Sequence, residues 1–141
     1  MNIKLLSENA TIPTYAHEGD AGMDLYSAID AVIPYGETVK VPTDVAMEIP
    51  TGFVGLIYAR SGLATKQGLA PANKVGVVDA SYRGNVIVAL HNHSKQPQKI
   101  HKGDRIAQMV IQPFVSLSLN VVDELDDTER GEGGFGSSDS R

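Results

Sequence analysis

Apolar and polar residues alternate over several short stretches of the chain, which is the pattern of half-buried β-strands. The clearest example lies between Val115 and Val121, where every second residue is Val or Leu and the residues between them are Ser or Asn. Other stretches are rich in β-branched and aromatic residues, which favour strands. We therefore predict strands over 38–41, 45–49, 52–59, 84–90 and 115–121.

Turn-forming residues separate these stretches, at Pro34-Tyr35-Gly36, Pro50-Thr51-Gly52 and Lys102-Gly103-Asp104. Helical periodicity is scarce, and one short helix is expected near Ser61 to Lys66. Many short strands joined by turns are typical of sandwiches and barrels. The predicted fold is all-β, a jelly-roll-like β-barrel or sandwich with one short helix, over residues 1–122.

The last part of the chain, 123–141, differs in kind and is called here the C-terminal arm. It is highly charged up to Glu129 and then reads RGEGGFGSSDS, with glycines around a single aromatic residue, Phe135. Such a segment buries too little apolar surface to order itself, so a disordered tail is one reading. The other is a flexible arm that closes over a flat, charged ligand, since glycines let backbone N–H groups approach phosphate oxygens.

Composition narrows the class of protein. The chain has 141 residues, the size of one ordinary domain, and no cysteine. Disulfides, thiol nucleophiles and cysteine-based zinc sites are therefore excluded. The N-terminus lacks a signal-peptide pattern, and no apolar run approaches the ~18 residues of a membrane helix. We expect a cytoplasmic protein without a membrane partner.

Charge is unevenly distributed along the chain. The net charge is -5, yet residues 51–122 carry eight Lys or Arg and only two acidic residues, Asp79 and Asp104. The middle of the chain is thus suited to an anion, although basic residues scattered over a solvated surface would give the same count. The acidic total argues against a nucleic-acid partner.

Five segments, taken together, resemble the trimeric dUTPase family, and they occur in the order and spacing of that family. The last one has Ser138 where the family usually has Thr. The segments are AGMDLYS (21–27), ARSGLA (59–64), NKVGVVDASYRG (73–84), GDRIAQM (103–109) and RGEGGFGSS (130–138). The resemblance implies a homotrimer with shared active sites that hydrolyses dUTP to dUMP and pyrophosphate with Mg²⁺. This reaction would remove dUTP and supply dUMP for thymidylate synthesis.

Asp79 and Tyr82 have both plain and functional readings. Read alone, Asp79 is a turn or capping residue and Tyr82 a packed strand aromatic. The resemblance implies that Asp79 activates a water for attack on the α-phosphorus, and that Tyr82 lies under the deoxyribose and rejects a 2′-hydroxyl. It also implies that a hairpin reads uracil through Asn73, Gly76 and Val78, where mismatched donors would be left unpaired.

The phosphate side is expected near the short helix. Arg60, Ser61 and Gly62 open that helix, where backbone N–H groups, a hydroxyl and an Arg fork suit an anion; an N-cap Ser beside a surface Arg is the alternative. Gln108 lies in a strand, on a face that we expect it to share with Ile106 and Val110, so its amide needs a partner. The resemblance gives Gln108 phosphate and the attacking water.

The remaining site residues follow from the resemblance. Asp24, which alone reads equally well as a buried structural residue, would bind waters of a Mg²⁺ chelated by the triphosphate. In the arm, Arg130 would grip the γ-phosphate and Phe135 would stack on uracil, next to Gly136 and Ser137. This arm would reach a neighbouring subunit, so that three chains build each site.

Two other functions fit the same fold. A dCTP deaminase needs an acid–base group beside the pyrimidine, for which the relatives use a Glu, and residues 51–122 contain none. A non-catalytic trimer that binds a nucleotide or a partner protein is the second, and Asp79, Tyr82, Gln108 and Arg130 argue against it.

Overall fold

The computed structural model describes residues 1–138; Asp139, Ser140 and Arg141, the end of the predicted arm over 123–141, lie outside the described residues. The described chain folds into twelve β-strands and one α-helix. In chain order these are β1 (Asn2–Leu5), β2 (Thr14–Tyr15), β3 (Gly22–Tyr26), β4 (Ala31–Ile33), β5 (Thr38–Pro42), β6 (Val45–Glu48), β7 (Phe53–Tyr58), α1 (Ser61–Gln67), β8 (Leu69–Pro71), β9 (Gly76–Val78), β10 (Ile87–Asn92), β11 (Gln98–Ile100) and β12 (Arg105–Pro113).

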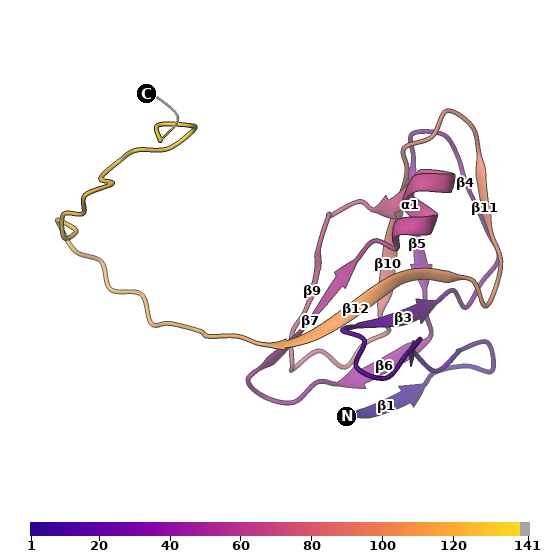
Figure 1. The fold of residues 1–141 in the computed structure, drawn as a ribbon. Coiled ribbons are helices and arrows are strands. Elements are labelled where there is room, and N and C mark those ends of the chain that lie inside the picture. The colour runs from indigo at the N-terminus through magenta and orange to yellow at the C-terminus, as the bar shows by residue number, and fades with distance from the viewer. Residues whose placement is uncertain (139–141) are drawn as a thin grey trace.

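All strand pairings are antiparallel, and they form four sheets (Figure 1). The largest sheet has five strands in the order β2-β3-β12-β7-β9, and a second has the order β5-β10-β8. Two-stranded sheets, β1-β6 and β4-β11, complete the body. The predicted all-β fold is confirmed as a sandwich; within the described residues the sheets do not close into a barrel.

The hydrophobic core is formed by strand residues that are buried at every second position. In β10, Val88, Leu90 and Asn92 are buried, and Ala89 and His91 between them are partly exposed. The fully buried side chains come from both large sheets and include Leu25, Val41 and Met109. Burial of such side chains stabilises a fold by roughly 1.5–3 kcal/mol each. The core therefore fixes the strands whose ends and connections carry the candidate site.

Most strand and helix predictions hold. The stretches 38–41, 45–49 and 52–59 correspond to β5, β6 and β7, and the predicted helix is α1. The helix ends at Gly68, whose φ of 69° lies in the left-handed region that glycine adopts easily. The stretch 84–90 is only partly a strand: β10 begins at Ile87, because the residues before it belong to a loop that also carries Tyr82.

The prediction of a strand over 115–121 is wrong for this chain. β12 ends at Pro113, and the next residues have no regular structure. Leu119 and Val121 are 94% and 98% exposed. A strand needs a partner for its backbone groups, and no described strand of this chain lies beside the segment. Figure 1 shows it leaving the body of the molecule.

Within residues 1–138, the chain has no helix with the length and apolar character needed to cross a membrane.

Candidate active site

The predicted site residues of the body fall into two separate pockets. The first is called the β9 pocket, has a volume of about 230 Å³, and is lined by Ile57, Asn73, Gly76, Val77, Val78, Asp79, Tyr82, Asn85, Val86 and Ile87. The second is called the α1 pocket, has a volume of about 220 Å³, and is lined by Ala16, Asp20, Gly22, Asp24, Arg60, Ser61, Gly62 and Gln108. The two pockets have no residue in common.

A tight turn before β9 shapes one wall of the β9 pocket. Its backbone N–H groups at Lys74 and Val75 donate to the carbonyl oxygens of Pro71 and Asn73, at 3.1 and 2.7 Å. Gly76 then lies against β7, and a Cβ added there would be 3.2 Å from the Cβ of Ile57. The absence of a side chain at Gly76 therefore keeps the pocket open beside Asn73.

The segment before and through β9 is a corner between two sheets. The preceding strand, β8, pairs with β10, whereas β9 pairs with β7. The expected hairpin from Asn73 is thus wrong in topology, because each strand finds its partner in a different sheet. The pocket is formed where the chain passes from one sheet to the other.

Tyr82 lies at the surface of the β9 pocket and is 45% exposed, so the reading as a packed core aromatic is wrong. Its hydroxyl donates to the carbonyl oxygen of Asn85 at 2.9 Å, and its ring lies so close to Gly84 that a Cβ there would collide with it. The Asn85 side chain is bound in turn by Asp44, through hydrogen bonds of 2.8 and 3.0 Å. The ring thus has a fixed place beside an open pocket.

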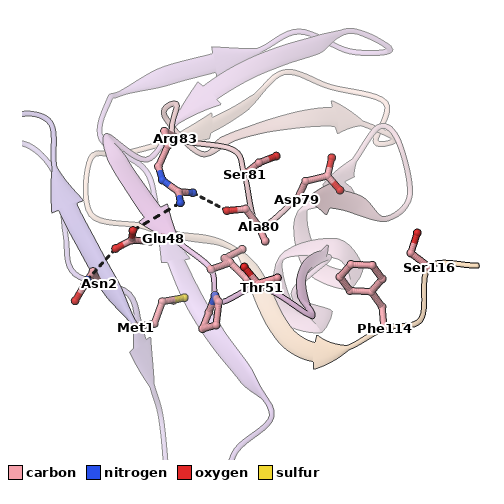
Figure 2. A pocket seen from close by; sticks show the side chains of 12 residues that line it. Met1, Asn2, Glu48, Thr51, Asp79, Ala80, Ser81, Arg83, Phe114 and Ser116 are labelled. Atoms are coloured by element: carbon pink, nitrogen blue, oxygen red, sulfur yellow. Dashed lines mark hydrogen bonds and ion pairs between the residues drawn. The ribbon is translucent and has the colours of Figure 1, made fainter.

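Asp79 directly follows β9 and is exposed. Its carbonyl oxygen accepts the Tyr82 N–H at 3.1 Å, which is a turn, as the plain reading predicted. Its carboxylate, however, has no hydrogen bond or ion pair within residues 1–138, so it does not act as a cap. Asp79 also borders a larger hollow of about 920 Å³, with Arg83, Phe114 and Ser116 in its lining (Figure 2).

Asp24 is the buried carboxylate of the α1 pocket, 6% exposed. Nε of Arg60 lies 2.8 Å from its Oδ1, and Nε of Arg105 lies 3.5 Å from its Oδ2. The structural reading of Asp24 therefore describes what the chain shows. A role toward a metal is compatible with it, because a carboxylate can accept several hydrogen bonds.

Arg60 and the start of α1 form the opposite wall. Arg60 is the N-cap, in an extended conformation, and makes no side-chain cap hydrogen bond. Ser61 is the first helical residue, so its alternative reading as the N-cap is wrong. The first turn contains no acidic residue. Backbone N–H groups at a helix start lack intrahelical partners, and Arg60 adds a positive charge beside them, so this wall can bind an anion.

Gln108 finds the partner that its position requires. Its Nε2 donates to the carbonyl oxygen of Ala59 at 2.9 Å, while a Cβ on Gly22 would collide with its Oε1. The expectation that Ile106 shares its face is wrong: Ile106 is fully buried, because a register shift after Arg105 interrupts the alternation. Val110 is partly exposed, like Gln108.

The arm residues lie apart from both pockets, neither of which is lined by a residue of 123–138. Arg130 donates from Nε to the carbonyl oxygen of Gly133 at 2.8 Å, a contact within the arm. Phe135 is fully exposed with a φ of 48°, and Gly136 has a φ of 85°. Ser137 makes a backbone bond to Gly134 at 3.1 Å. A single chain does not bring the arm to the site.

Sequence reasoning missed residues that support the site. Arg105, which follows the turn at Lys102-Gly103-Asp104, binds Asp24, and Asp104 accepts the backbone N–H of His101 at 2.7 Å. Asp20 lines the α1 pocket, where it accepts the backbone N–H of His17 at 2.9 Å. The strand register that places Arg105 opposite β3 depends on long-range pairing, which gives no local signal.

Known proteins resemble this chain along most of its length. A family model described as dUTPase matches residues 8–139. The deoxyuridine 5′-triphosphate nucleotidohydrolase of Clostridioides difficile is 44% identical over 97% of this chain and 96% of that protein. Its counterpart in Nocardia farcinica is 47% identical over 96% of this chain and 83% of that protein.

Solved structures agree with the sequence relatives. A mutant dUTPase of Staphylococcus bacteriophage 80alpha with dUpNHpp has a TM-score of 0.91 at 36% identity, covering 97% of this chain and 96% of the other. A mutant dUTPase of phage phi11 of S. aureus, described as revealing how a structural Mg(II) ion is coordinated, has a TM-score of 0.83 at 32% identity over 89% and 98% of the two chains.

Proposed function

Because this chain belongs to the dUTPase family, we propose that it hydrolyses dUTP to dUMP and pyrophosphate, with Asp79 as the residue that activates water. The observation that most directly supports this proposal is the environment of the Asp79 carboxylate. Asp79 is exposed, its carboxylate is unpaired within the described residues, and it lies at the β9 pocket. The reaction removes dUTP and provides dUMP for thymidylate synthesis.

The reaction needs a group that accepts a proton as water attacks. The Asp79 carboxylate takes a proton from the water while the water oxygen forms a bond to the α-phosphorus. The bond from that phosphorus to the bridging oxygen breaks, and pyrophosphate leaves with the electron pair. An arginine next to Asp79 would hold its charge in an ion pair, so the unpaired state of this carboxylate suits a base.

The β9 pocket suits a deoxyuridine. The Asn73 amide and the backbone through Val78 offer donors and acceptors for the pairing edge of uracil, and Gly76 leaves room for the base. Cytosine would present the wrong groups and leave buried partners unpaired, which costs about 1–3 kcal/mol per group. The ring of Tyr82, fixed over Gly84, lies under the sugar and excludes a 2′-hydroxyl.

The α1 pocket suits the phosphates. Arg60, the Ser61 hydroxyl and the backbone N–H of Gly62 are donors at a helix start, and Gln108 adds an amide. Gln108 contacts phosphate and the attacking water. Negative charge that develops on the leaving pyrophosphate is stabilised by these fixed donors.

A complete site requires more than one copy of the chain. The base-side and phosphate-side residues line different pockets of one chain, and the arm reaches neither of them. We infer a homotrimer in which one chain supplies the β9 pocket, a second the α1 pocket and a third the arm. Arg130 then binds the γ-phosphate, Phe135 stacks on uracil, and Gly136 and Ser137 offer backbone and hydroxyl donors.

Mg²⁺ fits the donor set of the α1 pocket. Within residues 1–138 no group of three or more His, Cys, Asp or Glu is placed to cage a metal. Two carboxylates, Asp20 and Asp24, line the pocket, which suits a Mg²⁺ that keeps its waters and is chelated by the triphosphate. When bound, the ion neutralises charge on the phosphates; Asp24 would hold its waters.

The test is release of pyrophosphate from dUTP, dCTP and UTP by the purified full chain, with and without Mg²⁺. We expect pyrophosphate to be released from dUTP but not from dCTP or UTP, and this release to be lost when Mg²⁺ is chelated. Ammonia from dCTP would show a deaminase. No product from any of the three, with retained binding of a non-hydrolysable dUTP analogue, would show a binding protein.

A further inference from the structure

The loop 79–86 carries both Asp79 and Tyr82 but lies outside the regular strands. It joins β9 to β10, and one backbone hydrogen bond, from Tyr82 N–H to the Asp79 carbonyl oxygen, closes its first turn. A base that activates water must be held within about 0.5 Å of its productive position. A turn of this kind therefore needs support from outside its own backbone.

Arg83, which does not line the β9 pocket, gives that support. Its Nη1 donates to the carbonyl oxygen of Ala80 at 2.6 Å and to that of Tyr82 at 3.2 Å. Its Nη2 lies 3.7 Å from Oε1 of Glu48 in β6. Figure 2 shows the guanidinium between the Ala80 carbonyl and the Glu48 carboxylate.

Glu48 is itself fixed on a strand pair. Its Oε2 accepts a hydrogen bond of 2.9 Å from Nδ2 of Asn2, and the two residues are register partners in the β1-β6 sheet. A continuous set of polar contacts thus leads from β1 through β6 to the turn after Asp79 (Figure 2).

We propose that Arg83 is a positioning residue for Asp79: it holds the carbonyl groups of Ala80 and Tyr82 against the β1-β6 sheet and so fixes the direction of the Asp79 carboxylate. The inference rests on the proposed dUTP hydrolysis. Arg83 does not itself line the β9 pocket, and it makes no hydrogen bond or ion pair with the Asp79 carboxylate. Its action on the reaction is therefore indirect, through the backbone.

The contacts predict a ranked effect. Both side chains of the Arg83–Glu48 pair are exposed, and exposed ion pairs contribute little to stability. The short bond to Ala80 is charge-assisted and is the stronger contact. The guanidinium contacts the two carbonyl groups and the carboxylate through two separate nitrogens, whereas a lysine side chain has a single nitrogen. Loss of Arg83 should thus matter more than loss of the Glu48 charge, and Lys should replace Arg poorly.

The experiment compares full-length Arg83→Gln, Arg83→Lys and Glu48→Gln with wild type in the dUTP assay. For Arg83→Gln we expect kcat to fall about tenfold with KM changed less than about twofold, because a displaced base affects turnover and not ground-state binding. The kcat of Arg83→Lys should lie between those of Arg83→Gln and wild type, and the kcat of Glu48→Gln should be about twofold below wild type. Lys99→Gln, in the separate β4-β11 sheet, removes an exposed charge as a matched control and should match wild type.

Amide hydrogen exchange gives a second readout that does not depend on turnover. The Tyr82 N–H should exchange faster in Arg83→Gln than in wild type, while amides of β10 stay unchanged. Wild-type kcat in a folded Arg83→Gln would overturn the inference. So would an unchanged Tyr82 exchange rate, or a KM that rises as far as kcat falls. If Arg83→Gln does not fold, equal kcat in Arg83→Lys, Glu48→Gln and wild type would overturn it. Failure of wild type to hydrolyse dUTP would instead refute the proposed function.

Discussion

Each of the two pockets contains an aspartate to which the proposed reaction gives a role, Asp24 in the α1 pocket and Asp79 in the β9 pocket, and these two carboxylates are in opposite situations. Asp24 is 6% exposed, lies on β3 between β2 and β12, and is bound by Arg60 and Arg105. Asp79 is exposed, lies on a loop, and has no side-chain partner within the described residues. The same functional group is thus built once as a buried, paired part of the scaffold and once as an exposed, unpaired group that the proposed reaction uses as its base.

This contrast shows how burial separates the two roles. A buried carboxylate requires compensating charge, and one of the two arginines that compensate Asp24, Arg60, also lines the α1 pocket. A carboxylate that must accept a proton is best left unpaired, and its position must then be fixed by backbone contacts. Stability should therefore depend on Asp24 and turnover on Asp79.

The largest expected effect is that of Asp79→Asn on turnover. The amide keeps the size of the side chain but accepts protons poorly, so kcat should fall by about 10²–10⁴. Binding of a non-hydrolysable dUTP analogue, measured by calorimetry, should persist, and the thermal unfolding midpoint should not change because the side chain is exposed. Turnover near that of wild type would show that Asp79 is not the base, and would remove the functional difference between Asp79 and Asp24.

Truncation after Asp127 is expected to have the next largest effect. The arm makes contacts within itself, such as Arg130 to Gly133, and lines neither pocket. The truncated chain should keep its fold and oligomeric state but lose about a hundredfold in kcat/KM, because the arm no longer orders the substrate. Light scattering and the pyrophosphate assay measure the two properties. Full activity would mean that the arm is a passive tail.

Asp24→Asn is expected to change stability. It replaces the carboxylate that pairs with Arg60 and Arg105 by a neutral amide with a single acceptor oxygen, and the free energy of unfolding should fall by about 1–3 kcal/mol, less than for a fully buried pair because both arginines are partly exposed. Urea unfolding at equal chain concentration measures the change, with Asp79→Asn as the control that should match wild type. An equal effect of the two substitutions would contradict the assignment of Asp24 to the scaffold.

Local patterns in the sequence predicted the β-strands and helix that a single chain can complete. Period-two alternation located β5 and β6, and the short helix expected near Ser61 to Lys66 is α1. The same alternation failed at 115–121, since a strand pattern describes a face to be buried but not the strand that will pair with it.

Part of the candidate site could also be predicted from the sequence, because some of its residues are close together along the chain. Neighbours in sequence, such as Asn73, Gly76, Asp79 and Tyr82, were expected together and do line one pocket. Contacts between distant segments were not readable. The pairing of Arg105 with Asp24 depends on the register of β12 with β3, and the contact of Arg83 with Glu48 depends on β6 passing beneath the loop. No local pattern in the sequence encodes either of these two contacts.

The most direct test of the central claim, that one site combines pockets from different chains, is complementation between two defective variants. Asp79→Asn lacks the base, and Ser61→Asp places a negative charge at the helix start of the α1 pocket, where an acid is tolerated by the helix but repels phosphate. Each variant alone should be inactive. After the two are unfolded and refolded together in equal amounts, random assembly of trimers should give about one quarter of wild-type turnover. Activity no greater than the mean of the two separate variants would show that each chain carries its own complete site, and would contradict the account.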